Sequence, residues 1–191
     1  MRLVIMGPPG AGKGTQAQHI AAHYGIPAIS TGDIFRANVS KGTPLGLEAK
    51  EYMDRGEYVP DDITNRMVGN RIGEPDAQPG FLLDGYPRTV AQVAELDGFI
   101  AASGHRLDTV LLLTVNREEV IVRLTQRAQI EGRADDTEEV IRRRQEVYAD
   151  QTAPLIDLYR DRGILIEIDG EGDVDDVTSR IFAALGHVAE S

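Results

Sequence analysis

Short apolar runs alternate with longer amphipathic stretches along most of the chain, and this alternation predicts strands that alternate with helices. The runs that we expect to form strands are Leu3–Met6, Ala28–Ser30, Phe81–Leu83, Thr109–Val115 and Ile164–Ile168. Each is short and almost wholly apolar, as is typical of strands buried on both faces of a parallel sheet. The pattern therefore predicts an α/β fold in which helices cover both faces of a five-stranded parallel sheet.

The stretches between these runs carry helical patterns. Helices are expected over Lys13–Tyr24, Asp61–Ile72, Val90–Ala102, from the fourth strand to about Gln126, and from Asp173 through Leu185, with two short helices in 31–59 separated by KGTPLG. Residues 127–136 have no apolar rhythm and are expected to form a loop. Asp136 and Glu139 have the spacing of a capping box, which predicts the start of a long helix that Pro154 interrupts.

The bulk composition narrows the class of protein. A chain of 191 residues is expected to form one domain, with or without insertions. Its 20 basic and 31 acidic residues give a net charge of −11, which argues against a nucleic-acid partner. The absence of cysteine excludes disulfides and thiolate metal sites and fits a reducing cytosol, so we expect a cytoplasmic protein. No apolar run approaches a membrane span, and residues 1–20 do not resemble a signal peptide.

The first chemical motif is GPPGAGKGT, residues 7–15, between the first predicted strand and helix. A phosphate loop requires this context, although the hydroxyl of Thr15 comes one place later than the usual pattern asks. Its glycines allow backbone N–H groups to form an anion nest, the helix adds the positive end of its dipole, and Lys13 supplies a point charge. A purely structural turn is disfavoured by a lysine between two glycines, and the spacing does not fit a dinucleotide-binding motif.

The second motif begins at Asp84, where the third predicted strand ends. In ATP sites an aspartate at this place is associated with magnesium, whereas the structural alternative is a turn or capping residue. The residues that follow it, Gly85 to Arg88, contain no carboxylate that could activate water, and the chain has no Asn-Lys-x-Asp base-reading motif. We therefore expect that the terminal phosphate is not transferred to water.

Arginines suggest where that phosphate goes instead. All but three of the 20 basic residues are arginine, and Arg123, Arg127, Arg133 and Arg144 bracket the predicted loop 127–136. Such a group favours a flexible lid that closes over polyphosphate. A phosphate acceptor is already anionic and needs no base, but several cations must bring the two anions together. The abundance of arginine and the absence of a His-Arg-Asp loop therefore favour a phosphate acceptor.

These motifs carry a resemblance to the adenylate kinase family over essentially the whole chain. The matching stretches are GPPGAGKGT, STGDIFR at 30–36, YVPDD at 58–62, LLDGYPRT at 82–89 with Gln92, and GRADD at 132–136. The resemblance implies a three-layer fold of the P-loop NTPase type with sheet order 2-3-1-4-5. It also implies a single kinase domain, 1–191, with a helical monophosphate-binding insert at 30–59 and a short lid at 126–136. The implied reaction is MgATP + AMP ⇌ MgADP + ADP.

The resemblance also implies roles for individual residues. ATP would be bound by Gly10, Ala11, Gly12, Lys13, Gly14, Thr15, Arg123, Arg127 and Gly172. AMP would be bound by Thr31, Arg36, Glu57, Tyr58, Val59, Gly85, Tyr86, Pro87, Arg88, Gln92, Arg133 and Arg144. The residues expected to act on the moving phosphoryl group are Lys13, Arg88, Arg123, Arg127, Arg133 and Arg144.

The remaining expectations concern the bound metal and the nucleobase of the acceptor nucleotide. Because Gly14 follows the lysine, we expect no direct protein ligand to Mg²⁺, which ATP oxygens and waters would hold, with Asp84 and Asp33 ordering the waters. The short lid lacks the cysteines that hold zinc in some longer lids, so no structural zinc is expected. A UMP/CMP kinase is the alternative within the class, but Thr31 and Gln92 suit adenine. An ATP-dependent switch and a nucleic-acid ATPase are the alternatives outside it, and the resemblance suggests a monomer.

Overall fold

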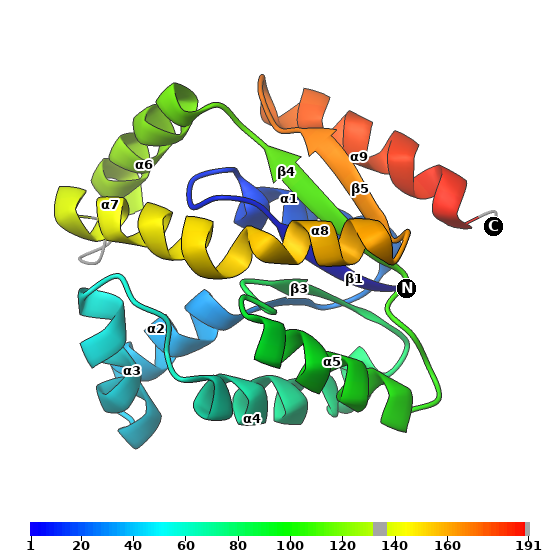
Figure 1. Cartoon of the computed structure of the whole chain (residues 1–191), viewed down its shortest axis with the longest axis horizontal. Helices are drawn as coiled ribbons and strands as arrows, with labels where there is room; N and C mark the ends of the chain where they lie inside the picture. Colours follow the sequence, from blue (N-terminus) through cyan, green and yellow to red (C-terminus); the bar gives the residue numbers. More distant parts are fainter. Residues whose placement is uncertain (132–136, 190–191) are drawn as a thin grey trace.

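A twisted sheet of five parallel strands runs through the centre of the molecule (Figure 1). The computed structural model describes residues 1–131 and 137–189, apart from the side chains at 117, 125, 127–131 and 187–189. The strands are β1 (Arg2–Met6), β2 (Ala28–Ser30), β3 (Phe81–Asp84), β4 (Thr109–Thr114) and β5 (Leu165–Asp169). Their order across the sheet is β2-β3-β1-β4-β5, and all pairs are parallel, which confirms the predicted fold class and strand order.

Alternate residues of each strand face opposite layers of the molecule. In β1, Leu3 and Ile5 belong to one hydrophobic cluster, whereas Val4 and Met6 belong to the other. The first cluster is completed by helices α1 (Lys13–Tyr24) and α9 (Val174–Ala189). The second is completed by α4 (Asp61–Ile72), α5 (Val90–Ala102) and α8 (Pro154–Asp161). The result is three layers, with helices on both faces of a sheet whose central strand, β1, is buried along its whole length.

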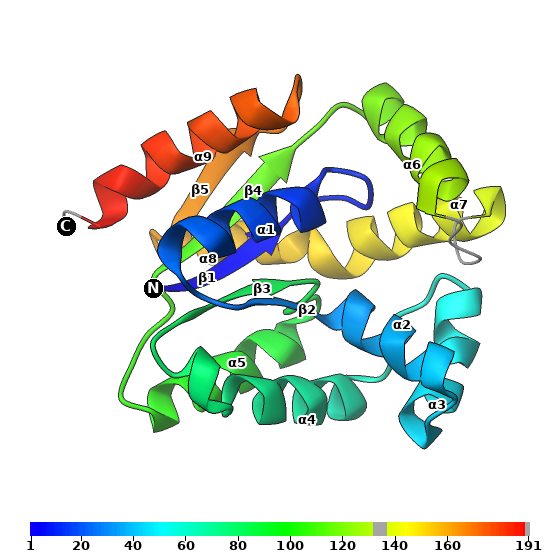
Figure 2. The same cartoon turned by 180° about the vertical axis from the view of Figure 1, so that it is seen from behind.

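The remaining helices lie at one end of the molecule, away from the C-terminus (Figures 1 and 2). They are α2 (Thr31–Lys41) and α3 (Pro44–Asp54) on one side and α6 (Arg117–Glu131) and α7 (Glu138–Val147) on the other. The α2–α3 pair has a small core of its own, in which Phe35 and Ala49 pack against Val59 and Ile63. This end is where the strands present their carboxyl termini, the edge at which open α/β sheets bind ligands.

Two boundaries near the predicted lid differ from the sequence-based expectation. Helix α6 continues to Glu131, so residues 127–131 are helical and the prediction of a loop there was wrong. Polar residues such as Gln and Glu sustain a helix without an apolar stripe, because their intrinsic helix propensity is high. The cap of α7 is Thr137, whose hydroxyl accepts from the N–H of Val140 at 3.4 Å, whereas Asp136 lies outside the described residues.

The long helix predicted after the lid is interrupted, as Pro154 led us to expect. A π-helical turn, Tyr148–Thr152, joins α7 to α8, and α8 has the proline in its first turn. A short 3-10 helix, Pro75–Ala77, leads from α4 towards β3. No helix in the described ranges is both long enough and apolar enough to cross a membrane.

Candidate active site

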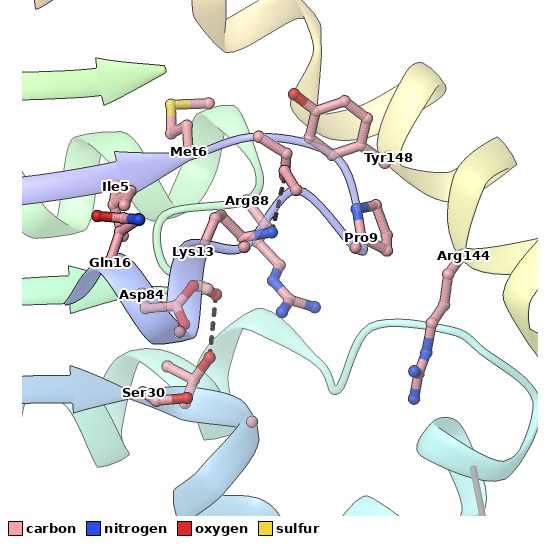
Figure 3. Close-up of a pocket in the computed structure, with 18 of the residues that line it drawn as sticks. Ile5, Met6, Pro9, Lys13, Gln16, Ser30, Asp84, Arg88, Arg144 and Tyr148 are labelled. Carbon is pink, nitrogen blue, oxygen red and sulfur yellow. Dashed lines mark hydrogen bonds between the residues drawn. The ribbon is translucent and has the colours of Figure 1, made fainter. Parts of the chain in front are cut away.

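A cavity of about 950 Å³ lies at the carboxyl ends of β1, β2 and β3 (Figure 3). Its walls are the loop after β1, the start of α2, the segment that leaves α3, the loop after β3, and parts of α6, α7 and the loop after β5. Every residue that the sequence singled out lines this cavity, except Arg127 and Arg133. The side chain of Arg127 and the whole of Arg133 fall outside the described residues. Cavities that bind one small molecule rarely exceed this volume, so the space suits more than one nucleotide.

The phosphate loop has the backbone shape of an anion site. Gly10 and Gly12 adopt φ values of 89° and 91°, a region that only glycine enters at no steric cost. A Cβ on Gly10 would lie 2.8 Å from Leu124 of α6, so the loop packs closely against that helix. The first helical hydrogen bond of α1 runs from the N–H of Gln16 to the carbonyl of Gly12 at 3.1 Å. The N–H groups just before it therefore point out of the helix end, where they can donate to phosphate.

Lys13 is held over this loop. Its Nζ donates to the carbonyl oxygens of Gly7 at 2.9 Å and Pro8 at 3.0 Å. Figure 3 shows the side chain folded back along the loop, within the cavity. The ammonium group thus lies beside the N–H groups that can donate to a phosphate, and it adds a full positive charge to their partial charges.

Asp84 lies beside the phosphate loop, at the end of β3. Its Oδ2 would be 3.8 Å from a Cβ on Gly14, so the carboxylate lies close to the start of α1. A carboxylate at this distance from the phosphate cradle suits a hard cation that keeps several waters, and the site therefore fits Mg²⁺. Asp33 also lines the cavity, but its carboxylate accepts from the guanidinium of Arg36. Across the described ranges, no three His, Cys, Asp or Glu side chains form a group able to hold a metal.

Arg123 joins three parts of the wall on the side of β4 and β5. Its guanidinium donates to the carbonyls of Ala11 at 3.4 Å and Gly170 at 3.0 Å, and its Nε donates to Glu119 at 2.9 Å. Gly172 lies nearby at φ 96°, in the loop that leads from β5 into α9. This wall therefore combines an arginine plane with a loop of exposed backbone, a combination that suits a nucleotide base and its first phosphates.

The opposite wall holds a polar cluster suited to a second base. The hydroxyl of Thr31 donates to the carbonyl of Gly85 at 3.0 Å. Gln92 is only 1% exposed, and its Oε1 accepts from the N–H of Arg88 at 2.7 Å. Its Nε2 donates to Asp61 at 2.8 Å, which fixes the orientation of the amide. A buried amide held in this way leaves its second N–H in a defined direction, as base recognition requires.

The segment after α3 completes this wall. Glu57, Tyr58 and Val59 line the cavity between the α2–α3 pair and α4. Arg36 reaches the cavity from α2, where a Cβ on Gly32 would lie 3.0 Å from its guanidinium. Tyr86 and Pro87 lie in the loop after β3, and the Tyr86 hydroxyl donates to Asn65 at 2.8 Å.

Two arginines face the space between the walls. Arg88 extends from the loop after β3 and Arg144 from α7, and both point into the same opening in Figure 3. The guanidinium of Arg88 lies over the ring of Tyr58, 4.7 Å from its centroid. Both guanidinium groups and Lys13 line one cavity, so three cations face the space between the walls although the chain as a whole is acidic.

Sequence reasoning missed several residues of the site. Asp61 orients Gln92, Thr152 contacts the backbone of Arg88, and Tyr148 lines the cavity from the turn after α7. Burial, with a contribution from Tyr58, raises the pKa of Tyr148 to about 12, so its hydroxyl stays protonated well into the alkaline range. Only Asp61 had a local signal, since it lies in the YVPDD stretch; Thr152 and Tyr148 come from a helical segment without a motif.

Comparison with known proteins agrees with this geometry. The sequence model of the family described as adenylate kinase matches residues 5–164. A protein of Nocardioides sp. strain JS614, named adenylate kinase, is 71% identical over 191 residues, which is all of both chains. Proteins of the same name from Clavibacter michiganensis and Thermobifida fusca are 59% and 58% identical, over 96% and 97% of this chain and 92% and 98% of their own.

Proposed function

Because the chain belongs to the adenylate kinase family, we propose that its cavity binds MgATP and AMP side by side and transfers the terminal phosphoryl group between them. Membership makes the protein a nucleoside monophosphate kinase, a phosphotransferase whose acceptor is a phosphate group. The observation that carries the proposal is the single cavity with a phosphate loop on one wall, a buried Thr31–Gln92 pair on the other, and Arg88 between them.

The donor side is assigned to the phosphate loop and the wall beside β4 and β5. We propose that the N–H groups of residues 10–15 and Lys13 hold the ATP phosphates, with Arg123 and Arg127 over the base and phosphates. Gly172 would meet the adenine through its backbone. The contacts of Arg123 with Ala11 and Gly170 support this assignment, because they place one guanidinium against both the loop and the base side.

The acceptor side is assigned to the α2–α3 pair and the loop after β3. Thr31 and Gln92 would contact the adenine of AMP, and Arg36 its phosphate. The backbones of 57–59 and 85–88 would line the ribose and phosphate. The hydrogen bonds that orient the Gln92 amide support a selective base site, which favours AMP over UMP or CMP.

The proposed reaction requires neutralisation of phosphate charge more than it requires proton transfer. In the forward direction, an oxygen of the AMP phosphate forms a bond to the γ-phosphorus while the bond to the β-phosphate oxygen breaks. The attacking oxygen is already anionic, so no general base is needed. Arg88, Arg144 and Arg133, with Lys13, would spread their positive charge over the moving group. Mg²⁺, ordered through water by Asp84 and Asp33, would offset further phosphate charge.

Residues 126–136 are proposed to act as a short lid. The helices that flank this segment, α6 and α7, both line the cavity. Gln145 of α7 also donates to the carbonyl of Pro9 at 3.2 Å, so the helix that follows the segment is joined to the phosphate loop. Closure would bring Arg127 and Arg133 over the phosphates and exclude water, which prevents loss of the phosphoryl group by hydrolysis.

The test is an ADP-formation assay with MgATP and one of AMP, UMP, CMP, GMP or no acceptor. Turnover with AMP well above that with the other four conditions is expected. Preference for UMP or CMP would assign the acceptor site to pyrimidines, and equal ADP formation without an acceptor would show hydrolysis instead. Omitting Mg²⁺ should abolish turnover, since the metal accompanies ATP.

We further propose that the enzyme works as a monomer in the cytoplasm, on free nucleotides rather than on nucleic acid or membranes. The net charge of −11 supports the exclusion of nucleic acid. Light scattering of the purified protein with and without nucleotides should give the mass of one chain in both states.

A further inference from the structure

Arg88 is contacted by two distant segments of the chain, at Tyr58 and Thr152, and by Gln92 close to it in the sequence. We propose that the side chains of Tyr58 and Thr152 form a unit that positions Arg88 for phosphoryl transfer. This inference rests on the proposed function, because it assigns Arg88 to the transferred group. Tyr58 and Thr152 are positioning residues here, which act through the arginine.

The backbone of Arg88 is fixed on both sides. Its N–H donates to Gln92 at 2.7 Å, and its carbonyl accepts from the hydroxyl of Thr152 at 2.9 Å. Gln92 is 1% exposed and Thr152 is 4% exposed, so water competes little for either bond. The Cα of Arg88 is therefore held in place by two buried side chains.

The hydroxyl of Tyr58 completes a directed chain. It lies 2.7 Å from the Thr152 hydroxyl. A threonine hydroxyl has one proton, and here that proton is used on the carbonyl of Arg88, so Thr152 accepts from Tyr58. The order is Tyr58 O–H to Thr152 O–H to the Arg88 carbonyl. Each bond in such a chain polarises and strengthens the next.

The ring of Tyr58 acts on the other end of Arg88. It lies under the guanidinium, 4.7 Å from centroid to Cζ. Stacking on a ring restrains the plane of a guanidinium while its edge N–H groups stay available for phosphate oxygens. Tyr58 thus contacts Arg88 twice, directly through its ring and through Thr152 by its hydroxyl.

The placement of these residues couples the arginine to both sides of the site. Tyr58 lies between α3 and α4, where the α2–α3 pair rejoins the sheet layers, and Thr152 ends the turn between α7 and α8. The unit therefore ties Arg88 to the acceptor wall and to the helix that follows the proposed lid.

Three variants distinguish the contribution of the hydroxyl hydrogen bonds from that of the Tyr58 ring. Tyr58→Phe keeps the ring and removes the hydroxyl, Tyr58→Leu removes both, and Thr152→Val removes the hydroxyl at constant shape. We expect kcat to fall about threefold to tenfold for Tyr58→Phe and Thr152→Val, the factor for one ordinary hydrogen bond, and further for Tyr58→Leu. Combining Tyr58→Phe with Thr152→Val should cost little more than Thr152→Val alone, because both remove the same bond.

Steady-state assays with MgATP and AMP measure these effects as a split between kcat and KM. The KM for ATP is expected to stay close to that of the unmodified enzyme. Thr152→Val leaves the buried carbonyl of Arg88 without its donor, so its thermal unfolding midpoint should fall by a few degrees, and kcat is measured well below that midpoint. Thr152→Ser should restore kcat, since it returns the hydroxyl. The matched control is Tyr52→Phe, which removes a phenol hydroxyl from a tyrosine whose ring lies 5.1 Å from Arg55, outside the proposed site.

Two results distinguish this proposal from the proposed function. If the unmodified enzyme turns over AMP and the Tyr58 and Thr152 variants match its kcat, the positioning unit is overturned alone. If the unmodified enzyme shows no AMP-dependent turnover, both proposals fall. Strict additivity of the two hydroxyl losses would also overturn the directed chain.

Discussion

Arg88 shows how much a single residue's chemistry depends on where its atoms are held. Its side chain carries a permanent charge and a planar fork of donors. Both suit the equatorial oxygens of a phosphoryl group in the transition state of its transfer. Around it, a buried amide, a buried hydroxyl and an aromatic ring restrict both backbone and guanidinium. The charge is therefore held in place before any ligand binds, which is the preorganisation that the role proposed for Arg88 requires.

Replacing this residue should affect the chemical step most. We expect Arg88→Ala to lower kcat by about a hundredfold or more, because one preorganised donor to the transition state is lost. Arg88→Lys should also be impaired, since it keeps the charge but not the fork. The control is Arg142→Ala, at an exposed arginine of α7 that pairs only with Glu138 among the ion pairs of the described residues. A kcat for Arg88→Ala within a few-fold of the control would remove Arg88 from the mechanism.

Among individual residues, the sequence pointed to those that lie within a short recognisable motif. The phosphate loop and the stretch around Asp84 and Arg88 are each recognisable within a few neighbouring positions. Thr152 lies 64 positions from Arg88, and no local pattern marks it as a partner. Contacts of that kind depend on how helices pack, and packing depends on many weak interactions at once.

At the scale of elements, strands were easier to predict than helix ends. Buried parallel strands appear as uninterrupted apolar runs, so each strand was found within about a residue of its bounds. The end of α6 was missed because residues 127–131 carry no apolar stripe in the sequence, although they are helical. Beyond the sheet, helix length depends on propensity and capping, which are weaker signals than burial.

Helices α2 and α3 pack so closely that one added methyl group at their contact should force them apart. A Cβ on Gly46 would lie 2.1 Å from the carbonyl oxygen of Asn38, which is backbone and cannot move aside. We expect Gly46→Ala to cost about 1–3 kcal/mol of unfolding free energy. It should also raise the KM for AMP more than that for ATP, because α2 carries Thr31 and Arg36.

The matched control for that change is Gly98→Ala in α5. Nothing lies within 4 Å of the added Cβ, so this variant should be neutral or stabilised by up to about 1 kcal/mol. Denaturant unfolding and the two KM values measure both variants. A Gly46→Ala protein as stable as Gly98→Ala would contradict the tight packing of α2 on α3.

At the scale of the whole molecule, buried phenols set a limit on stability at alkaline pH. Burial raises the pKa values of Tyr86 and Tyr159, and it raises that of Tyr148 to about 12. In the unfolded chain these groups ionise at about pH 10. The folded state then retains protons that the unfolded state releases, so the stabilisation is complete below about pH 10 and is lost as the pH rises through the folded pKa values.

The unfolding free energy should therefore fall with pH above about 10, at a slope set by the difference in bound protons. Tyr148→Phe should make this decline shallower, because one of the groups that differ between the two states is removed. Denaturant unfolding at several alkaline pH values measures the slope. A slope that is equal in the variant and the unmodified protein would contradict a raised pKa at Tyr148.

The strand order has a consequence for how the acceptor specificity of such an enzyme can evolve. β2 and β3 lie on one side of β1, and β4 and β5 lie on the other. The proposed acceptor contacts, apart from Arg133 and Arg144, come from one uninterrupted stretch, 31–92, on the β2–β3 side. The donor contacts lie before and after that stretch. A new acceptor could thus be acquired by exchange of one continuous piece of gene, while the half that handles ATP is inherited intact.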